Sequence, residues 1–380
     1  MGGHALPLSA CPESGENPPG NPVGGHRPAG RIFPAGPTTT GCQGSRAVRG
    51  DAPQRAERLE FQILLMPFRC LLFVLLSCML PWATEGLGAQ ADGVAPDLRV
   101  AVVMSSREAP YQEALQALRA SLLAAEPGAN IEVLATGGVA VTDLANRRLV
   151  ITVGTQAAQR VTELAPPRPV LHTLLPASAY ERLAHNRNGT PASAIFLDQP
   201  AERQIALLRL ALPEWPRVAL IAGSASEKLA QRLRDAAAAR QLMVRVSSIG
   251  SDDELYPALQ QVLAEPAVLV ALPDTSVFNS YTVQNVLLTA YRNRSPVLGF
   301  SAAYVRAGAL LSLYSTPSQI GAQTGMVAAQ VLHGERLPAP AAPTQFEVGI
   351  NLNVARSLGI VMKPAHELTA ELQRRERGQP

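Results

Sequence analysis

Leu98-Arg-Val-Ala-Val-Val-Met104 is an almost continuous apolar run, and residues 110–125 follow it with an amphipathic pattern. The run has the length of a β-strand and little polar alternation, which is typical of a strand buried on both faces of a parallel sheet. In the second segment, apolar residues spaced by four, three and four positions share one helical face: Tyr111, Leu115, Leu118 and Leu122. This stretch therefore predicts a strand followed by a helix.

The same alternation of strand-like and helix-like segments recurs along the chain. Further apolar runs of strand length occur at residues 131–134, 149–153, 169–175, 218–222, 244–247, 267–272 and 296–299. Segments with helical spacing occur at residues 156–164, 201–212, 226–241, 253–264 and 278–292. Alternating strands and helices predict the α/β class, in which helices cover both faces of a parallel sheet.

A break in this rhythm predicts two lobes rather than one large sheet. Between Pro176 and Pro200 the helical pattern weakens, and the turn-rich segment Asn186-Arg-Asn-Gly-Thr-Pro191 intervenes. Further joints are expected at residues 301–306 and in the proline-rich segment 337–343. We therefore predict two doubly wound parallel-sheet lobes joined by a three-strand hinge. Residues 98–200 and 304–338 are assigned to lobe 1, and residues 201–301 and 345–370 to lobe 2.

Length and composition exclude several classes of protein. The chain has 380 residues, of which 47% are apolar and 17% charged, so wholesale disorder is excluded and more than one domain is expected. The formal net charge is only +3, and no basic block occurs. A nucleic acid is therefore not an expected partner.

Residues 1–65 do not have the pattern of a folded domain. The first 50 residues contain 11 Gly and 8 Pro without a repeat or an apolar period, so they cannot form a core. We expect this low-complexity segment to be either untranslated, with Met66 as the true start, or a disordered tail.

Residues 66–91 have the features of a signal peptide. Arg69 supplies the positive charge, the apolar run Cys70–Leu80 follows, and Ala89 and Ala91 form a small-residue cleavage site. The alternative, a transmembrane anchor, needs an apolar run of about 20 residues. The sequence therefore predicts export to the periplasm, with a mature chain beginning near Asp92.

The cysteines agree with this division. All four precede Asp92, so the mature chain has no disulfide and no thiol nucleophile. The segment Leu75-Leu-Ser-Cys78 loosely resembles a lipoprotein processing box, and a lipid anchor at Cys78 is the alternative to a freely diffusing protein.

Several segments occur in the order and spacing of a known family. The ordered series resembles the ABC transporter substrate-binding family, whose members have the type 1 periplasmic fold. The segments that carry the resemblance are Ala271–Asn279, Ser295–Phe300, Val305–Ser312, Gln319–Gln323, His333–Gly334 and Gly349–Ile360. The resemblance implies an exported receptor, with amino acids among the family's ligands, that closes on a small molecule and delivers it to a membrane permease. The protein is expected to be a monomer.

The candidate ligand residues follow from a rule for parallel sheets, in which ligands bind at the carboxyl ends of the strands. After the first and third predicted strands, the chain presents Ser105, Ser106, Thr155 and Gln156. Free helix amides near Gln156 could hold a carboxylate, while the alternative for Thr155 is a helix cap.

In lobe 2 the same rule selects another group of residues: Ser226, Asp274, Thr275, Phe300, Ser301 and Tyr304. Asp274 could pair with an ammonium group, and its alternative is a helix cap. Ser224 and Glu227 have the spacing of a capping box, which favours a structural role for both.

The sequence contains neither a Gly-x-Ser-x-Gly elbow nor a phosphate loop of the Gly-x-x-x-x-Gly-Lys type. The histidines of the mature chain are scattered, so no metal site and no cofactor are expected. The Gly-x-x-x-Gly segment Gly321–Gly325 is expected to pack closely on a sheet. Trp215 lies at the start of a strand, away from the expected cleft, which disfavours a sugar and favours an amino acid or another small carboxylate. A periplasmic sensing subunit is the main alternative function, and a periplasmic enzyme on the same fold is a remote one.

Overall fold

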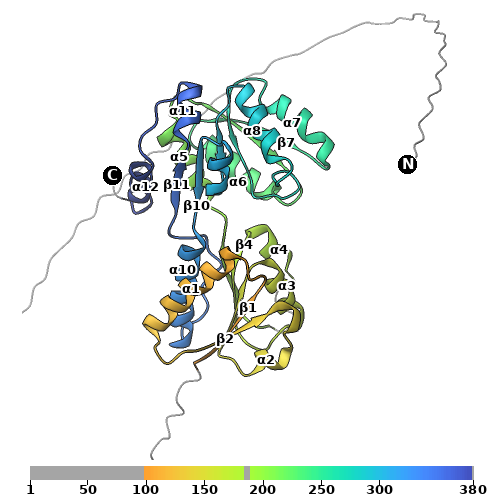
Figure 1. The fold of residues 1–380 in the computed structure, drawn as a ribbon, viewed down its shortest axis with the longest axis vertical. Coiled ribbons are helices and arrows are strands. Elements are labelled where there is room, and N and C mark those ends of the chain that lie inside the picture. Colours follow the sequence, from red (N-terminus) through yellow and green to blue (C-terminus); the bar gives the residue numbers. More distant parts are fainter. Residues whose placement is uncertain (1–97, 184–188, 379–380) are drawn as a thin grey trace, which may run out of the picture. The chain divides into compact units, whose positions relative to one another are not determined.

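The computed structural model describes residues 98–183 and 189–378 (Figure 1). Five parallel strands form the first sheet, in the order β2 (Asn130–Ala135), β1 (Arg99–Met104), β3 (Leu149–Val153), β4 (Val170–Leu175) and β5 (Ala192–Phe196). The proposed tail, signal peptide, cleavage site and Cys78 lie outside the described residues.

Six strands form the second sheet. Their order is β11 (Glu347–Ile350), β10 (Leu311–Tyr314), β9 (Val297–Gly299), β8 (Val268–Val270), β6 (Arg217–Ala222) and β7 (Met243–Ser248). The pairs are parallel except for β10 and β11, which run antiparallel. The α/β class with two sheets agrees with the prediction, and the antiparallel edge strand was not foreseen.

Helices cover both faces of each sheet. The first lobe contains α1 (Ala109–Ala125), α2 (Val141–Ala145), α3 (Thr155–Leu164), α4 (Ala177–Arg182), α10 (Pro317–Leu332) and the short helix η1 (Thr136–Gly138). The second contains α5 (Ala201–Ala211), α6 (Glu227–Ala238), η2 (Asp252–Glu254), α7 (Leu255–Val262), α8 (Val283–Arg292), α9 (Ala302–Ala307), α11 (Leu352–Leu358) and α12 (Ala365–Glu376).

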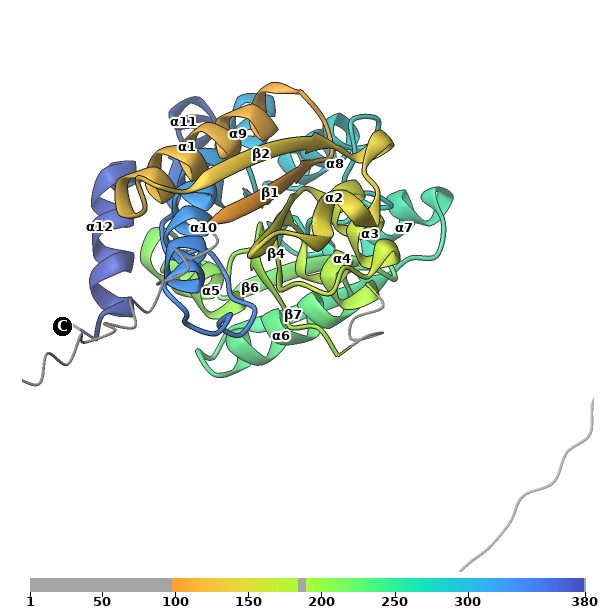
Figure 2. The same ribbon diagram turned by 90° about the horizontal axis from the view of Figure 1, so that it is seen from below.

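The alternation of side chains along β1 explains the doubly wound arrangement. Val100 and Val102 pack into the cluster that includes residues of α1 and α10, while Ala101 and Val103 pack into the cluster on the α2 and α3 side. Figure 2 shows these two helix pairs on opposite sides of the strands. The continuous apolar run is therefore buried on both faces, as such a strand requires.

The chain crosses between the lobes at three places, and two of them differ from the expectation. The crossings are residues 197–200, 315–316 and 341–346. The first crossing follows β5, a strand of the first sheet, and therefore comes after the turn-rich segment that ends at Pro191. The joint expected at residues 301–306 is wrong, because α9 and β10 belong to the second sheet and the chain leaves that lobe only after Tyr314. Residues 304–314 therefore belong with the second lobe. With four residues, β10 is too short to stand out from the apolar run Ala309–Leu313, which explains the error.

The Gly-x-x-x-Gly segment of α10 packs mainly on a helix, not on a sheet. A Cβ added to Gly321 would lie 2.2 Å from the carbonyl oxygen of Ala114 in α1, and one added to Gly325 would lie 2.6 Å from that of Leu118. The two glycines therefore allow the backbones of α1 and α10 to approach closely. This corrects the expectation of packing on a sheet.

No helix within the described ranges is long and apolar enough to cross a membrane. In the same ranges, no group of three or more His, Cys, Asp or Glu side chains is placed to hold a metal ion.

Candidate functional site

A cavity of about 750 Å³ lies between the carboxyl ends of strands from the two sheets. This volume is within the range of small-molecule sites. The first lobe contributes Pro110, Glu113, Pro176, Leu197, Asp198 and Gln199, and the second contributes residues that include Ala271, Pro273, Asp274, Thr275, Phe278, Phe300, Ser301 and Arg306. The cavity is where the rule for parallel sheets places a ligand.

Four of the ten sequence-predicted site residues line this cavity. They are Asp274 and Thr275, which follow β8, and Phe300 and Ser301, which follow β9. Phe300 supplies an apolar wall, and its ring centroid lies 4.6 Å from that of Tyr304. Tyr304 itself stands behind Phe300 and is only 8% exposed, so it belongs to the core of the second lobe. Burial raises the pKa of Tyr304 to about 12.

Asp274 is held by hydrogen bonds from its own lobe. Its Oδ2 accepts from Ser226 Oγ at 2.7 Å, and its Oδ1 accepts from the amide and hydroxyl of Ser276 at 3.0 and 2.6 Å. Burial pushes the pKa of Asp274 upward, but the hydrogen bonds from Ser276, Ser226 and the Gly223 amide outweigh it and lower the pKa. Asp274 therefore remains ionised and ties the loop after β8 to the start of α6.

Ser226 has a structural role in this arrangement. It is buried, it occupies the N-cap position of α6, and its hydroxyl is 3.1 Å from the Gly223 amide that donates to it. The capping box expected between Ser224 and Glu227 does not form, because α6 begins at Glu227 itself. Ser226 lines a second, smaller cavity of about 250 Å³, which shares Asp198, Leu229 and Pro273 with the large one.

The predicted residues of the first lobe lie outside the lining of the large cavity. Ser105 Oγ accepts from the Ala157 amide at 2.8 Å and so caps the first turn of α3, which contains Thr155 and Gln156. Ser106 Oγ accepts from the Glu108 amide before α1. The α3 amides that were expected to hold a carboxylate are thus partly satisfied by Ser105.

Asp198 is a cavity residue that the sequence analysis missed. It follows β5, lines both cavities, and accepts a hydrogen bond from the Ala177 amide at 2.5 Å. Burial raises its pKa, only partly offset by the amides of Ala177 and Asp198 and by Arg232. The strand that precedes Asp198, β5, was not recognised in the sequence. Its sequence, Ala192-Ser-Ala-Ile-Phe196, has few large apolar residues. Recognising β5 would have placed Asp198 at a strand's carboxyl end.

Glu113 and Arg306 also line the cavity and were not predicted. Glu113 Oε1 accepts from the hydroxyl of Ser318 at 2.8 Å, which joins α1 to the start of α10. Arg306 lies on α9 and is the basic residue among those that line the large cavity. No hydrogen bond or ion pair joins Arg306 to another residue of the described ranges.

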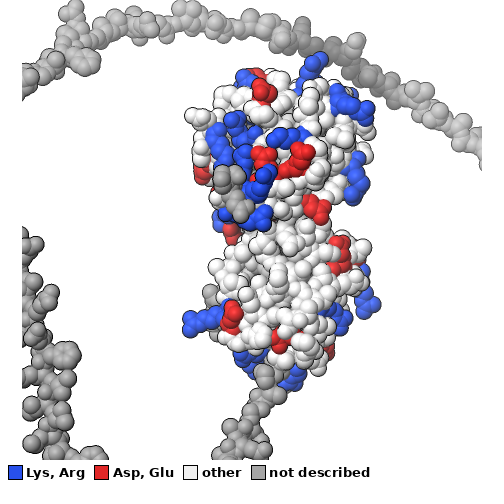
Figure 3. All heavy atoms as spheres, turned by 90° about the vertical axis from the view of Figure 1, so that its left-hand side faces the viewer, with Lys and Arg blue, Asp and Glu red and all other residues white. Residues whose placement is uncertain are grey.

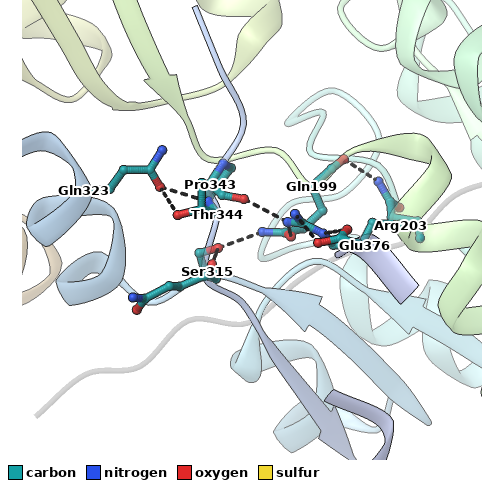
Figure 4. Close-up of polar contacts among 9 residues, drawn as sticks. Gln199, Arg203, Ser315, Gln323, Pro343, Thr344 and Glu376 are labelled. Atoms are coloured by element: carbon teal, nitrogen blue, oxygen red, sulfur yellow. Dashed lines mark hydrogen bonds and ion pairs between the residues drawn. The ribbon is translucent and has the colours of Figure 1, made fainter. Parts of the chain in front are cut away.

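A polar network joins the three crossings between the lobes (Figure 4). Gln199, in the first crossing, donates from Nε2 to Ser315 Oγ of the second at 2.9 Å, and Ser315 Oγ donates to the Gln345 carbonyl of the third at 2.5 Å. The buried guanidinium of Arg203 donates to Gln199 Oε1 at 2.8 Å and to the Pro343 carbonyl at 2.9 Å.

The last turn of the C-terminal helix completes this network. Glu376 of α12 forms an ion pair with Arg203 at 2.5 Å and accepts a second hydrogen bond from it at 3.0 Å. The guanidinium carbon of Arg203 also lies 4.3 Å from the ring centroid of Phe346, in the third crossing. We call Gln199, Arg203, Ser315, Pro343 and Glu376 the hinge network.

The surface charge is unevenly distributed on the face that carries α1 and α12 (Figure 3). Basic and acidic side chains gather on the second lobe, where Glu371 of α12 pairs with Lys363 and Arg375. The face of the first lobe seen in this view is largely uncharged.

The geometry agrees with the comparison to known families. Residues 138–370, more than half of the chain, match the family described as ABC transporter substrate binding protein. The chain therefore belongs to the ABC transporter substrate-binding family, and its two-lobe fold is the type 1 periplasmic fold of such proteins. Members of this family bind small molecules and work with ABC permeases.

Solved structures share the fold at low sequence identity. A conserved domain protein from Vibrio cholerae has a TM-score of 0.51 and 22% identity, over 71% of this chain and 97% of that one. A ligand-free, open substrate-binding protein with adhesive properties from Clostridium difficile has a TM-score of 0.56 and 20% identity, over the same shares. A Streptococcus pneumoniae domain in complex with L-tryptophan has a TM-score of 0.51 and 17% identity, again over the same shares. The sequence has no significant match among curated proteins.

Proposed function

We propose that this protein captures a small amino acid or a related carboxylate between its lobes and presents it to the permease of an ABC transporter. The observation that carries the proposal is the cavity of about 750 Å³ at the carboxyl ends of strands from both sheets. Two lobes joined by short crossings can close on a ligand by rigid-body motion.

The lining of the cavity supports this ligand class. Apolar side chains supply much of the wall, among them Leu197, Phe278 and Phe300. Polar and charged side chains supply the rest, and they include acidic side chains together with Arg306. Such a lining suits an apolar body that carries both an ammonium and a carboxylate group. Asp274, Thr275, Phe300 and Ser301 are proposed as ligand contacts.

Trp215 packs against the core of the second lobe and does not line the cavity. Phe278, Phe300 and Tyr314 do line it, so the choice between an amino acid and a sugar rests on the charged side chains and on the titrations below.

The test is a calorimetric titration of the purified protein with L-leucine, L-phenylalanine, L-tryptophan, ribose and glucose. We expect at least one amino acid to bind and both sugars to fail. Binding of a sugar alone would keep the capture function and refute the proposed ligand class. If none of the five compounds binds, both the capture function and the proposed ligand class are contradicted.

We propose that the protein acts as an exported monomer in the periplasm. The support is the signal-peptide pattern of residues 66–91 and the absence of cysteine after it. N-terminal sequencing of the periplasmic fraction should yield a chain that begins near Asp92. A lipid on Cys78 would establish the anchored form instead, and retention of residues 1–65 on exported protein would refute the processing scheme.

A further inference from the structure

Asp198 and Asp274 line the same cavity, but their surroundings differ. Both oxygens of Asp274 accept hydrogen bonds from hydroxyl groups of its own lobe. The donors to Asp198 are backbone amides, those of Ala177 and of Asp198 itself. Within the described ranges, no Lys or Arg forms an ion pair with Asp198. The carboxylate of Asp198 therefore has acceptor capacity that the protein leaves unused.

We infer that Asp198 receives a cationic amine of the ligand, so that the captured molecule is an ammonium compound. This inference rests on the proposed function and names the group that recognises the ligand. A carboxylate removed from water without a cation is unfavourable, whereas a cation brought to it forms a charge-assisted hydrogen bond. An ammonium ligand supplies the missing cation at the moment of binding.

The charges around Asp198 explain why the protein does not neutralise it. Lys228 Nζ of α6 forms an ion pair with Glu181 Oε2 of α4 at 2.6 Å. Arg232 lowers the pKa of Asp198 and Glu181 raises it, so these two neighbours oppose one another. Burial outweighs both and leaves the pKa above its ordinary value. A ligand cation therefore meets a site that no side chain already occupies.

Arg306 is the residue that would bind the carboxylate group of the ligand, while Asp198 binds its ammonium group. It stands on the second lobe, whereas Asp198 stands at the end of the first, and it has no ion pair among the described residues. A molecule with an ammonium and a carboxylate group can satisfy one charge from each lobe. Because both side chains line the same cavity, such a ligand would bind both lobes at once and so stabilise an arrangement in which the lobes stay together.

The position of Asp198 also connects the ligand to the hinge. It precedes Gln199, whose side chain bonds Ser315 and Arg203. The amine is thus held by the first crossing segment itself, next to the hinge network.

The test compares matched pairs that differ only in the amine. The pairs are L-leucine and isocaproate, L-phenylalanine and hydrocinnamate, and L-tryptophan and indolepropionate. Each is titrated calorimetrically into the wild type and into Asp198→Asn, which keeps an oxygen to accept from the Ala177 amide. A second variant, Glu163→Gln, removes one acidic charge from the exposed part of α3 and controls for net charge.

We expect at least one amino acid to bind the wild type and Glu163→Gln at least about tenfold more tightly than its amine-free partner. In Asp198→Asn the difference should largely disappear. A difference that survives in Asp198→Asn would overturn the assignment to Asp198, while amino-acid capture would stand. Equal binding of both members of a pair to the wild type would overturn the ammonium class but not capture. If no member of any pair binds, the inference fails, and the sugar titrations decide whether the capture function fails with it.

Discussion

At the scale of single residues, the two cavity carboxylates should respond oppositely to removal of their charge. The pKa of Asp274 is lowered in the folded protein, so its ionised form contributes stability that is present above the ordinary pKa of 3.8 and is lost as the pH falls through the folded pKa. Asp274→Asn should therefore lower the free energy of unfolding at pH 7, by about 1–3 kcal/mol, because hydroxyl donors lose their ionised acceptor.

The pKa of Asp198 is raised, so the folded state disfavours its ionised form and loses stability as the pH rises above 3.8. Asp198→Asn should leave the unfolding free energy at pH 7 unchanged or increase it, and any gain should vanish in acid. Urea unfolding of both variants at several pH values measures this contrast. Equal destabilisation by the two variants at pH 7 would show that the charge of Asp198, like that of Asp274, stabilises the folded state through hydrogen bonds within the protein.

The predicted site residues show what a strand-end rule can find. Asp274, Thr275, Phe300 and Ser301 follow strands that were recognised, and they line the cavity. Asp198 follows β5, which was not recognised, so the rule could not be applied to it. The positions of Tyr304 and Ser105 depend on packing and capping between segments distant in sequence, and no local pattern reports those contacts.

At the scale of elements, the contact between α1 and α10 depends on Gly321. An exposed Gly in the middle of a helix usually gains about 0.5–1 kcal/mol when replaced by Ala. Gly321→Ala should instead destabilise the protein by about 1–3 kcal/mol, because the new methyl group would lie 2.2 Å from the Ala114 carbonyl oxygen. Gly137→Ala is the matched control, since nothing lies within 4 Å of its added Cβ. Similar thermal midpoints for the two variants would refute the close-packing account.

The ion pair between α12 and the hinge network gives a second prediction for elements. Arg203 has a side chain 7% exposed and Glu376 one 34% exposed, so removing Glu376 leaves a buried cation short of its partner. Glu376→Ala should cost about 1–3 kcal/mol of unfolding free energy, discounted for the exposure of Glu376.

Glu371→Ala is the control on the same helix, because Glu371 pairs with the more exposed Lys363 and Arg375 and should cost about 0–1 kcal/mol. Chemical denaturation of both variants measures the difference. Equal losses would mean that the hinge network adds nothing to an ordinary surface ion pair.

The elements themselves were largely predictable, and the exceptions have a common cause. The eight predicted strands are present in the structure: most are compact apolar runs, and β2 and β7 alternate apolar with polar residues. The three strands missed, β5, β10 and β11, are short or contain small and polar residues such as Ser193, Ser312 and Gly349. Missing β10 placed the second crossing about ten residues too early, because a strand defines its lobe only through the sheet it joins.

At the scale of the whole molecule, family membership and the two-sheet fold define a substrate-binding protein, while the ligand depends on a few side chains from both lobes. The central claim is that a small amino acid is captured between the loops that follow β5, β8 and β9. Such capture should slow amide hydrogen exchange in loops of both lobes at once. A ligand that contacts one lobe alone would leave the loops of the other lobe exposed to solvent.

The measurement that tests this claim most directly is amide hydrogen exchange of the full chain, with and without saturating L-leucine, L-phenylalanine or L-tryptophan. For at least one of these probes, we predict slower exchange in residues 197–200 of the first crossing together with residues 271–278 and 300–306 of the second lobe. Protection confined to one lobe, or no change with any of the three amino acids, would contradict the account.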